Sequence, residues 1–146
     1  MRLRLATAAP CLPSAVRVLA GMLAMERCLA APARAMRDGA VGDVLVERDG
    51  VLCGIVTDRD IVVRAIAENR NPAEVKIGDI CSRDLATLTP DTSVEDAVRL
   101  MRDKALRRIP VCDDGKPVGV VSIGDLAIDR DGQSALADIS AARPND

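Results

Sequence analysis

The chain of 146 residues contains no Phe, Tyr, Trp or His. Without aromatic side chains it cannot stack bases on aromatic platforms, which is how proteins usually bind single-stranded nucleic acid. The absence of histidine excludes Ser-His-Asp and Cys-His catalysis and most zinc sites. Any ligand must therefore be held by backbone groups, hydroxyls, carboxylates and arginines.

Strong charge of either sign is also missing. The formal net charge is -2, with 49% hydrophobic and 29% charged residues. This composition is typical of a globular protein, and it predicts neither nucleic acid nor an anionic membrane as a partner. No apolar segment is long enough to span a bilayer. The length fits one compact domain, or two small halves that share a core.

The cysteines are odd in number and include no C-x-x-C pair, which argues against a disulfide framework or a zinc ribbon. An A-x-A-like stretch ending at Ala35 resembles a signal-peptide cleavage site. However, Pro10, Pro13 and Arg17 interrupt the apolar run before it. We therefore predict a reducing, cytoplasmic location with free cysteines, namely Cys11, Cys28, Cys53, Cys81 and Cys112.

An internal repeat dominates the rest of the chain. Residues 34–61 align with residues 99–126 at a constant offset and without a gap. Met-Arg-Asp occurs at the start of both copies, Asp-Gly in the middle, and a Gly-x-Val-[Thr/Ser]-x-x-Asp element at the end. An agreement this long and this ordered predicts two copies of one structural unit.

Each copy has the pattern helix, strand, turn, strand, helix. In the second copy, Thr92 and Glu95 have the spacing of a capping box, and apolar residues then follow at helical intervals. We predict a strand over 107–112, a turn at Gly115, and a return strand followed by a helix from Ile123. In the first copy the second helix begins at Asp58 and ends near Asn69.

These residues resemble the cystathionine β-synthase (CBS) domain family, and two units in tandem resemble a Bateman module. The stretch "GDICSRDLATLTPDTSVEDAVRLMRDKALRRIPVCDDGKPVGVVSIGDL" carries the family pattern through nearly its whole length. The resemblance covers roughly residues 33–128. It implies an α/β fold in which two β-α-β-β-α units pack about a pseudo-twofold axis.

The resemblance leads to the following domain boundaries. Residues 33–69 form a partial first CBS unit, 70–75 a linker, 76–130 the second unit, and 131–146 a polar tail. Residues 1–32 form an atypical segment, because "AMERCLAAP" does not reproduce "TPDTSVEDA" of the second copy. We therefore expect a first unit that is atypical or truncated at its N-terminus, with its first helix starting near Pro32.

The family uses the Gly-x-Val-[Thr/Ser]-x-x-Asp element to bind nucleotides, which implies two ribose sites in the cleft between the units. A carboxylate can accept hydrogen bonds from both ribose hydroxyls, and a glycine allows close approach. The implied residues are Thr57, Asp60, Ser122 and Asp125 for ribose, with Gly54 and Gly119 for close approach. The same hydroxyls and carboxylates could instead serve only as helix caps, and the sequence leaves both interpretations open.

Phosphate requires positive charge, and here the copies differ. Arg107 and Arg108 precede the strand of the second copy, where Gly42 and Asp43 stand in the first. We predict that the second site favours phosphorylated ligands, with Arg59 compensating in part at the first. The arginines could also be a solvated, carboxylate-paired surface cluster. With no aromatic residue available, Ile109 and Val111 are the expected contacts for the base.

The predicted function is a non-catalytic regulatory module for an adenosine-containing ligand such as AMP, ATP or S-adenosylmethionine. No cofactor or metal is required, and no nucleophile-base pair or phosphate loop indicates an enzyme. Cys81 is predicted to pack near the cleft. The expected partners are a second copy of the chain and an unidentified regulated protein. The alternative is a ligand-independent dimeric interaction or stress-response protein.

Overall fold

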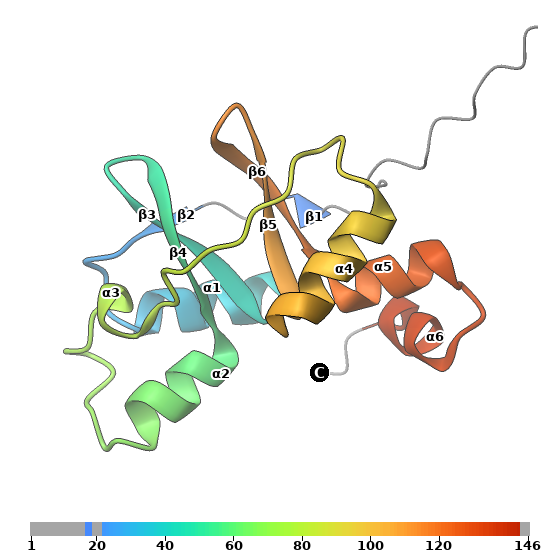
Figure 1. The fold of residues 1–146 in the computed structure, drawn as a ribbon. Coiled ribbons are helices and arrows are strands. Elements are labelled where there is room, and N and C mark those ends of the chain that lie inside the picture. Colours follow the sequence, from blue (N-terminus) through green and yellow to red (C-terminus); the bar gives the residue numbers. More distant parts are fainter. Residues whose placement is uncertain (1–16, 19–21, 144–146) are drawn as a thin grey trace, which may run out of the picture. The chain divides into compact units, whose positions relative to one another are not determined.

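The computed structural model describes residues 17–18 and 22–143, and within them the chain divides into two compact units (Figure 1). We call residues 18–86 the N-terminal unit. The C-terminal unit is formed mainly by residues from Thr87 onward, together with Arg17. Each unit combines a small sheet with helices, which confirms the predicted mixed α/β class.

The N-terminal unit contains a three-stranded sheet in the order β2 (Met22–Ala24), β3 (Asp43–Arg48), β4 (Val51–Thr57). β2 runs parallel to β3, and β3 pairs antiparallel with β4, so that Asp43 lies opposite Thr57. The helices of this unit are α1 (Ala30–Gly39), α2 (Asp58–Ile61), the π-helix η1 (Val62–Ile66) and α3 (Ile77–Ile80).

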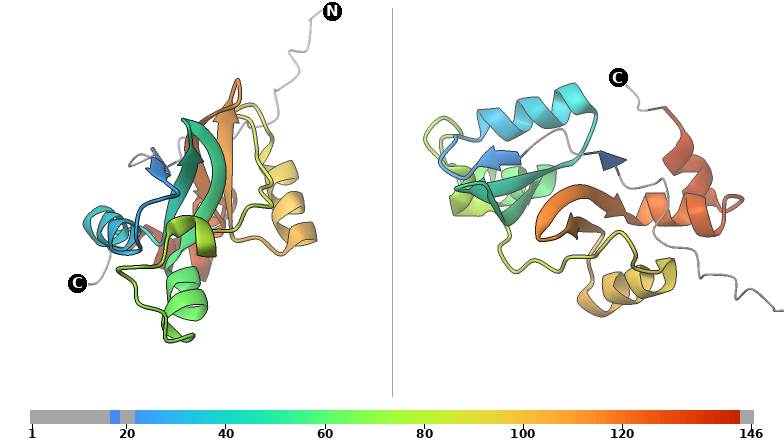
Figure 2. Two further views of the ribbon diagram at one scale, coloured as in Figure 1. Left: turned by 90° about the vertical axis from the view of Figure 1, so that its left-hand side faces the viewer. Right: turned by 90° about the horizontal axis from the view of Figure 1, so that it is seen from above.

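The C-terminal unit repeats this plan. Its sheet has the order β1 (Arg17–Val18), β6 (Lys116–Ser122), β5 (Arg108–Asp113). Its helices are α4 (Val94–Lys104), α5 (Ile123–Arg130) and α6 (Ala135–Ala141). Figure 2 shows α6, drawn in red, lying beside α5, drawn in orange.

The repeat in the sequence is reproduced by the backbone. β3 and β5 cover equivalent residues, as do β4 and β6. The connecting turns also agree, because Asp49 and Gly50 have φ of 55° and 79°, and Asp114 and Gly115 have 45° and 76°. Two consecutive positive φ values suit Asp-Gly in a tight hairpin, so the predicted turn at Gly115 is confirmed.

The start of the first unit is atypical in sequence, which is one of the two predicted alternatives, but it is not truncated. Leu23 in β2 pairs with Val46, as Leu88 pairs with Val111 in the other unit. The apolar residue at the start of each helix is also retained, because Leu29 is equivalent to the buried Val94, the first residue of α4. Leu29 precedes α1 with 1% of its surface exposed. The segment therefore keeps the buried positions of the repeat while replacing its capping residues.

Two local predictions need correction. The cap of α4 is Ser93, whose Oγ accepts from the Asp96 N–H at 3.1 Å, while Thr92 Oγ1 accepts from the Thr89 N–H. The helix expected over 58–69 turns into the π-helix η1, where the Ala67 N–H donates to the Val62 carbonyl at 2.9 Å. The predicted polar tail contains α6.

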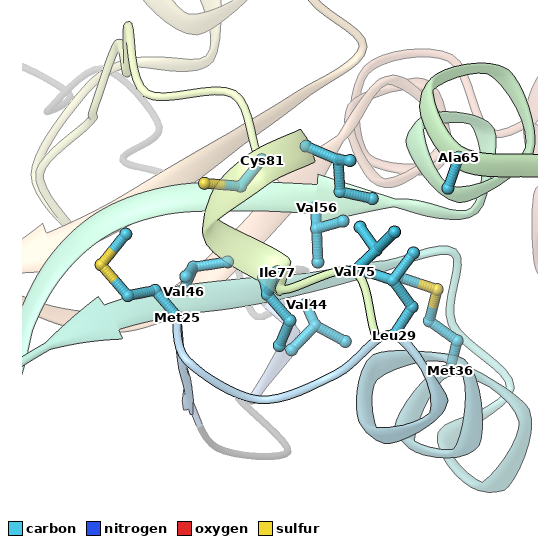
Figure 3. Close-up of a cluster of buried hydrophobic side chains, with 11 residues drawn as sticks. Met25, Leu29, Met36, Val44, Val46, Val56, Ala65, Val75, Ile77 and Cys81 are labelled. Atoms are coloured by element: carbon cyan, nitrogen blue, oxygen red, sulfur yellow. The ribbon is translucent and has the colours of Figure 1, made fainter. Parts of the chain in front are cut away.

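Each unit has its own apolar core. In the N-terminal unit, side chains from α1, β3, β4 and α3 converge with those of the connecting segments, among them Leu29, Val46 and Ile77 (Figure 3). In the C-terminal unit, Val94, Ala97 and Met101 of α4 pack with residues of β5 and β6. These three lie on one face of the helix as the periodicity predicts. The cores fix the strand ends from which the predicted site residues project.

Candidate functional site

The predicted ribose residues of the N-terminal unit form a capping box at the start of α2. Thr57 donates to Asp60 Oδ2 through its backbone N–H at 2.9 Å and through its hydroxyl at 2.7 Å. In return the Asp60 N–H donates to Thr57 Oγ1 at 3.1 Å. The hydroxyl and the carboxylate therefore meet each other, and together they satisfy donors that a helix start leaves open.

The C-terminal unit builds the same arrangement at the start of α5. Ser122 donates to Asp125 Oδ2 from its backbone N–H at 2.8 Å and from its hydroxyl at 2.6 Å. The Asp125 N–H donates to Ser122 Oγ at 3.3 Å. A carboxylate offers about four acceptor positions, and both capping contacts from Ser122 use one oxygen. Capping by Asp125 is therefore compatible with accepting further hydroxyl donors.

The structure brings Arg107 next to the Ser122 motif. The Ile123 N–H donates to the Arg107 carbonyl at 3.0 Å, so the residue before β5 lies beside the first residue of α5. The equivalent bond in the N-terminal unit joins the Asp58 N–H to the Gly42 carbonyl at 3.2 Å. An exposed arginine in one unit is thus replaced by a glycine in the other.

The other predicted phosphate and base residues occupy different environments. Arg108 opens β5 and is half-buried, whereas Arg59 lies exposed on α2. Ile109 and Val111 are both 0% exposed and belong to the core of the C-terminal unit. Their side chains therefore present no surface to a base, and base contacts would have to come from other groups.

The space beside Gly54 is filled by the chain itself. A Cβ at this position would lie 2.9 Å from Cys81 Sγ and 3.1 Å from the Ser82 carbonyl oxygen. Ile55 and Ser82 also form an antiparallel bridge here. Gly54 thus admits the segment after α3, and Cys81 is buried in this contact. Gly119, its equivalent, is buried in β6.

Arg64 is a site residue that the sequence analysis did not find. Its Nε lies 3.3 Å from Asp60 Oδ1, and its Nη1 donates to the Ile80 carbonyl at 2.6 Å. Only 12% of the Asp60 side chain is exposed. The spacing of Asp60 and Arg64 is that of an ion pair along one helix face, which is the signal that could have revealed it.

Over the part of the chain that the structure describes, no group of His, Cys, Asp or Glu side chains is arranged to hold a metal ion. Among the same residues, none of the helices has the length and apolar character needed to cross a bilayer. The side chains at the two strand ends are hydrogen-bonding and charged groups suited to a polar ligand.

Comparison with known proteins identifies the family. The CBS domain matches residues 29–66 and 77–128. The chain belongs to the CBS domain family. Both CBS segments include the hairpin and the capping box of one unit, so the resemblance found in the residues is confirmed.

Two relatives and one solved structure illustrate the match. An uncharacterized protein of Methanopyrus kandleri is 40% identical over 93 residues, covering 62% of this chain and 47% of the relative. The CBS domain-containing protein YhcV of Bacillus subtilis is 38% identical over 82 residues, covering 53% of this chain and 58% of the relative. A hexameric CBS-CP12 protein from bloom-forming cyanobacteria has a TM-score of 0.77 at 21% identity. The superposition covers 87% of this chain and 75% of that protein.

The alignments cover about half the length of these two relatives. Neither relative has a name that describes an enzymatic activity, and stand-alone CBS proteins are typically non-catalytic regulatory modules. The solved structure, at 21% identity, supports the fold alone.

Proposed function

We propose that this CBS protein is a non-catalytic sensor that binds an adenosine-containing ligand such as AMP, ATP or S-adenosylmethionine. The observation that carries the proposal is the position of Arg107 beside the Ser122–Asp125 pair, fixed by the Ile123–Arg107 backbone bond. A carboxylate for ribose and a cation for phosphate then lie at one strand end. The cleft predicted between the two units stays a prediction.

The C-terminal unit is the better candidate for the phosphorylated ligand. Arg107 and Arg108 replace Gly42 and Asp43, a difference of three formal charges. For partly screened charges a few ångströms apart, each contributes on the order of 1 kcal/mol. In the other unit Asp60 Oδ1 lies 3.3 Å from Arg64 Nε.

Calorimetry and thermal unfolding with AMP, ATP and S-adenosylmethionine test the proposal. A ligand at a hundredfold excess over Kd stabilises the folded state by about 2.7 kcal/mol. An unchanged melting temperature with all three ligands at millimolar concentration would refute it. Asp125→Asn should weaken binding strongly because it removes the charge but keeps an acceptor for the cap. Asp60→Asn is the matched change in the other unit and should weaken binding less.

Arg107→Gln isolates the phosphate contribution. We expect ATP affinity to fall about fivefold while adenosine affinity is unchanged, since about 1 kcal/mol of attraction is lost. Arg99→Gln is the control, because Arg99 on α4 is paired with Asp96 at 2.9 Å. Equal losses for both variants would show a general charge effect and remove Arg107 from the site.

A ligand-independent, self-associating protein is the second candidate, and exposed apolar side chains favour it. Val62 is 57% and Ile66 49% exposed on η1. Exposed apolar residues that cluster on one element often mark an interaction surface. Ile66→Lys should lower the association constant measured by sedimentation, whereas Val51→Lys should not, although Val51 is 65% exposed on β4. Association without nucleotide binding would favour this candidate over the sensor.

A further inference from the structure

A pocket of about 720 Å³ lies within the C-terminal unit, between α4, α5 and the connection from α5 to α6. Small-molecule sites are commonly clefts of roughly 300–1,000 Å³ with mostly apolar walls and a few placed polar groups. The apolar wall here consists of aliphatic side chains, namely Val98, Met101, Leu106, Ile123, Leu126 and Ala127. In size and lining, the pocket fits a small organic ligand.

The residues beyond the repeat complete this pocket. Asp131 and Ser134, which connect α5 to α6, contribute to the lining, and Ser134 caps α6 by accepting from the Ala137 N–H at 3.2 Å. α6 packs closely against α5. The absence of a side chain at Gly124 of α5 allows this, since a Cβ there would lie only 2.6 Å from Ser140 Oγ of α6. The lining therefore includes Asp131 and Ser134, which lie outside the predicted second CBS unit.

The charged groups of the lining are Arg102, Arg130 and Asp131. Arg102 is paired with Asp103 at 3.0 Å. Within residues 17–18 and 22–143, Arg130 has no ion pair, so its guanidinium is the cation available to a ligand. An arginine beside an aliphatic wall suits a ligand with an apolar chain and an anionic head.

The N-terminal unit has different residues at these positions. In the register of the repeat, Ala65 replaces Arg130 and Asp58 replaces Ile123. Ala65 is 0% exposed in the core, and Asp58 places a carboxylate where the C-terminal unit has an aliphatic side chain. The combination of apolar wall and cation is thus particular to the C-terminal unit.

We propose that the pocket between α4, α5 and the start of α6 binds an aliphatic carboxylate, with its chain along Val98, Met101 and Leu126 and its head at Arg130. The absence of aromatic side chains favours a flexible aliphatic chain over a flat ring, which would gain no stacking here. Met101 adapts its shape readily to such a chain. This ligand is additional to the adenosine-containing ligand proposed above, and it uses other side chains.

Titration calorimetry of the full chain with decanoate, below its micelle-forming concentration, tests the proposal. Decanol and decyltrimethylammonium are the matched neutral and cationic probes. We expect decanoate to bind with one site per chain, decanol more weakly, and the cation least. Equal affinities for all three head groups, or no saturable binding of decanoate, would overturn the proposal.

Two opposite charge changes locate the head group. Arg130→Gln should lower the affinity for decanoate about threefold to fivefold, as expected for an exposed ion pair, and leave the affinity for decanol unchanged. Asp131→Asn should strengthen decanoate binding, because it removes the one anion of the lining. If Arg130 only stabilised the end of α5, its substitution would lower the melting temperature without changing the preference for decanoate over decanol, and the proposed contact would be wrong.

Ala127→Leu tests the chain site, because Ala127 is half-buried in the lining and a larger side chain would fill the pocket. Decanoate binding should be lost while the melting temperature and any nucleotide binding are kept. A second copy of the chain is the competing occupant. If the wild type is a dimer that binds no decanoate and Ala127→Leu dissociates it, the pocket is a protein interface and the ligand proposal fails.

Discussion

The N-terminal and C-terminal units place the same hydroxyl and acid at the start of their second helix, but surround them differently. In the N-terminal unit, Arg64 binds Asp60 and also reaches the Ile80 carbonyl. The C-terminal unit has Asp129 at the position of Arg64 and Arg107 at the position of Gly42. The N-terminal unit thus has an arginine on the helix that follows the strand end, whereas the C-terminal unit has one just before its first hairpin strand.

The comparison shows which parts of a repeat can diverge. The capping boxes and the hairpins are the same in both units because they hold the local backbone together. The residues beside the caps differ in charge between the units, as Arg107 and Gly42 do. Specialisation of one unit for a ligand therefore requires changes only around the retained cap.

Replacing an equivalent core residue in each unit should give the largest effects. Ile109→Ala should lower the free energy of unfolding by about 2–5 kcal/mol, because it removes a fully buried side chain. Val44→Ala, at the equivalent position, should cost about 1 kcal/mol less, since the side chain is smaller and 8% exposed. Urea unfolding followed by circular dichroism measures both. Equal losses would mean that the two cores are not packed alike.

Removing the cap hydroxyls should have an intermediate effect. Thr57→Ala and Ser122→Ala should each lower the free energy of unfolding by about 1 kcal/mol, because each hydroxyl accepts from a helix N–H and donates to an acid. Nucleotide binding, measured by calorimetry on the same variants, should fall more for Ser122→Ala. If Thr57→Ala weakened it more, the assignment of the better site to the C-terminal unit would be reversed.

The smallest expected difference between the units is in the reactivity of their thiols. Burial raises the pKa of Cys53 in the N-terminal unit and of Cys112 in the C-terminal unit. The thiolate is the reactive form, so alkylation of both should be slow at neutral pH and should accelerate only above the usual thiol pKa. Peptide mapping after iodoacetamide treatment across a pH series measures each site. Rapid modification of either thiol at pH 7 would contradict the prediction for that unit.

The sequence predicted the hairpins well because their determinants are local. Asp-Gly specifies the positive φ values of each turn, and the apolar residues on either side of it indicate the two strands. It predicted the strand-end motif for the same reason, since Thr57 and Asp60 are close in sequence. The spacing of Asp60 and Arg64 is also a local signal, whereas the second contact of Arg64, with the Ile80 carbonyl, joins segments distant in sequence and could not be predicted.

The remaining differences also have physical causes. The segment around Leu23 and Leu29 keeps the apolar side chains of the repeat but not its polar capping residues, so a comparison based on capping residues could not find it. The cap of α4 lies at Ser93 rather than Thr92 because Thr92 already bonds within the preceding turn. α6 was missed because its only buried side chain is Ala137, which leaves a weak apolar pattern.

The pairing of β1 with β6 has a consequence for how the protein is made. During translation the strand at Arg17 emerges long before its neighbour at Lys116–Ser122 has been synthesised. The sheet of the N-terminal unit, by contrast, is complete once β4 has left the ribosome. The unit that carries Arg107 and Arg108 at the start of its hairpin is thus the one whose sheet is completed last, and contacts this distant along a chain form slowly.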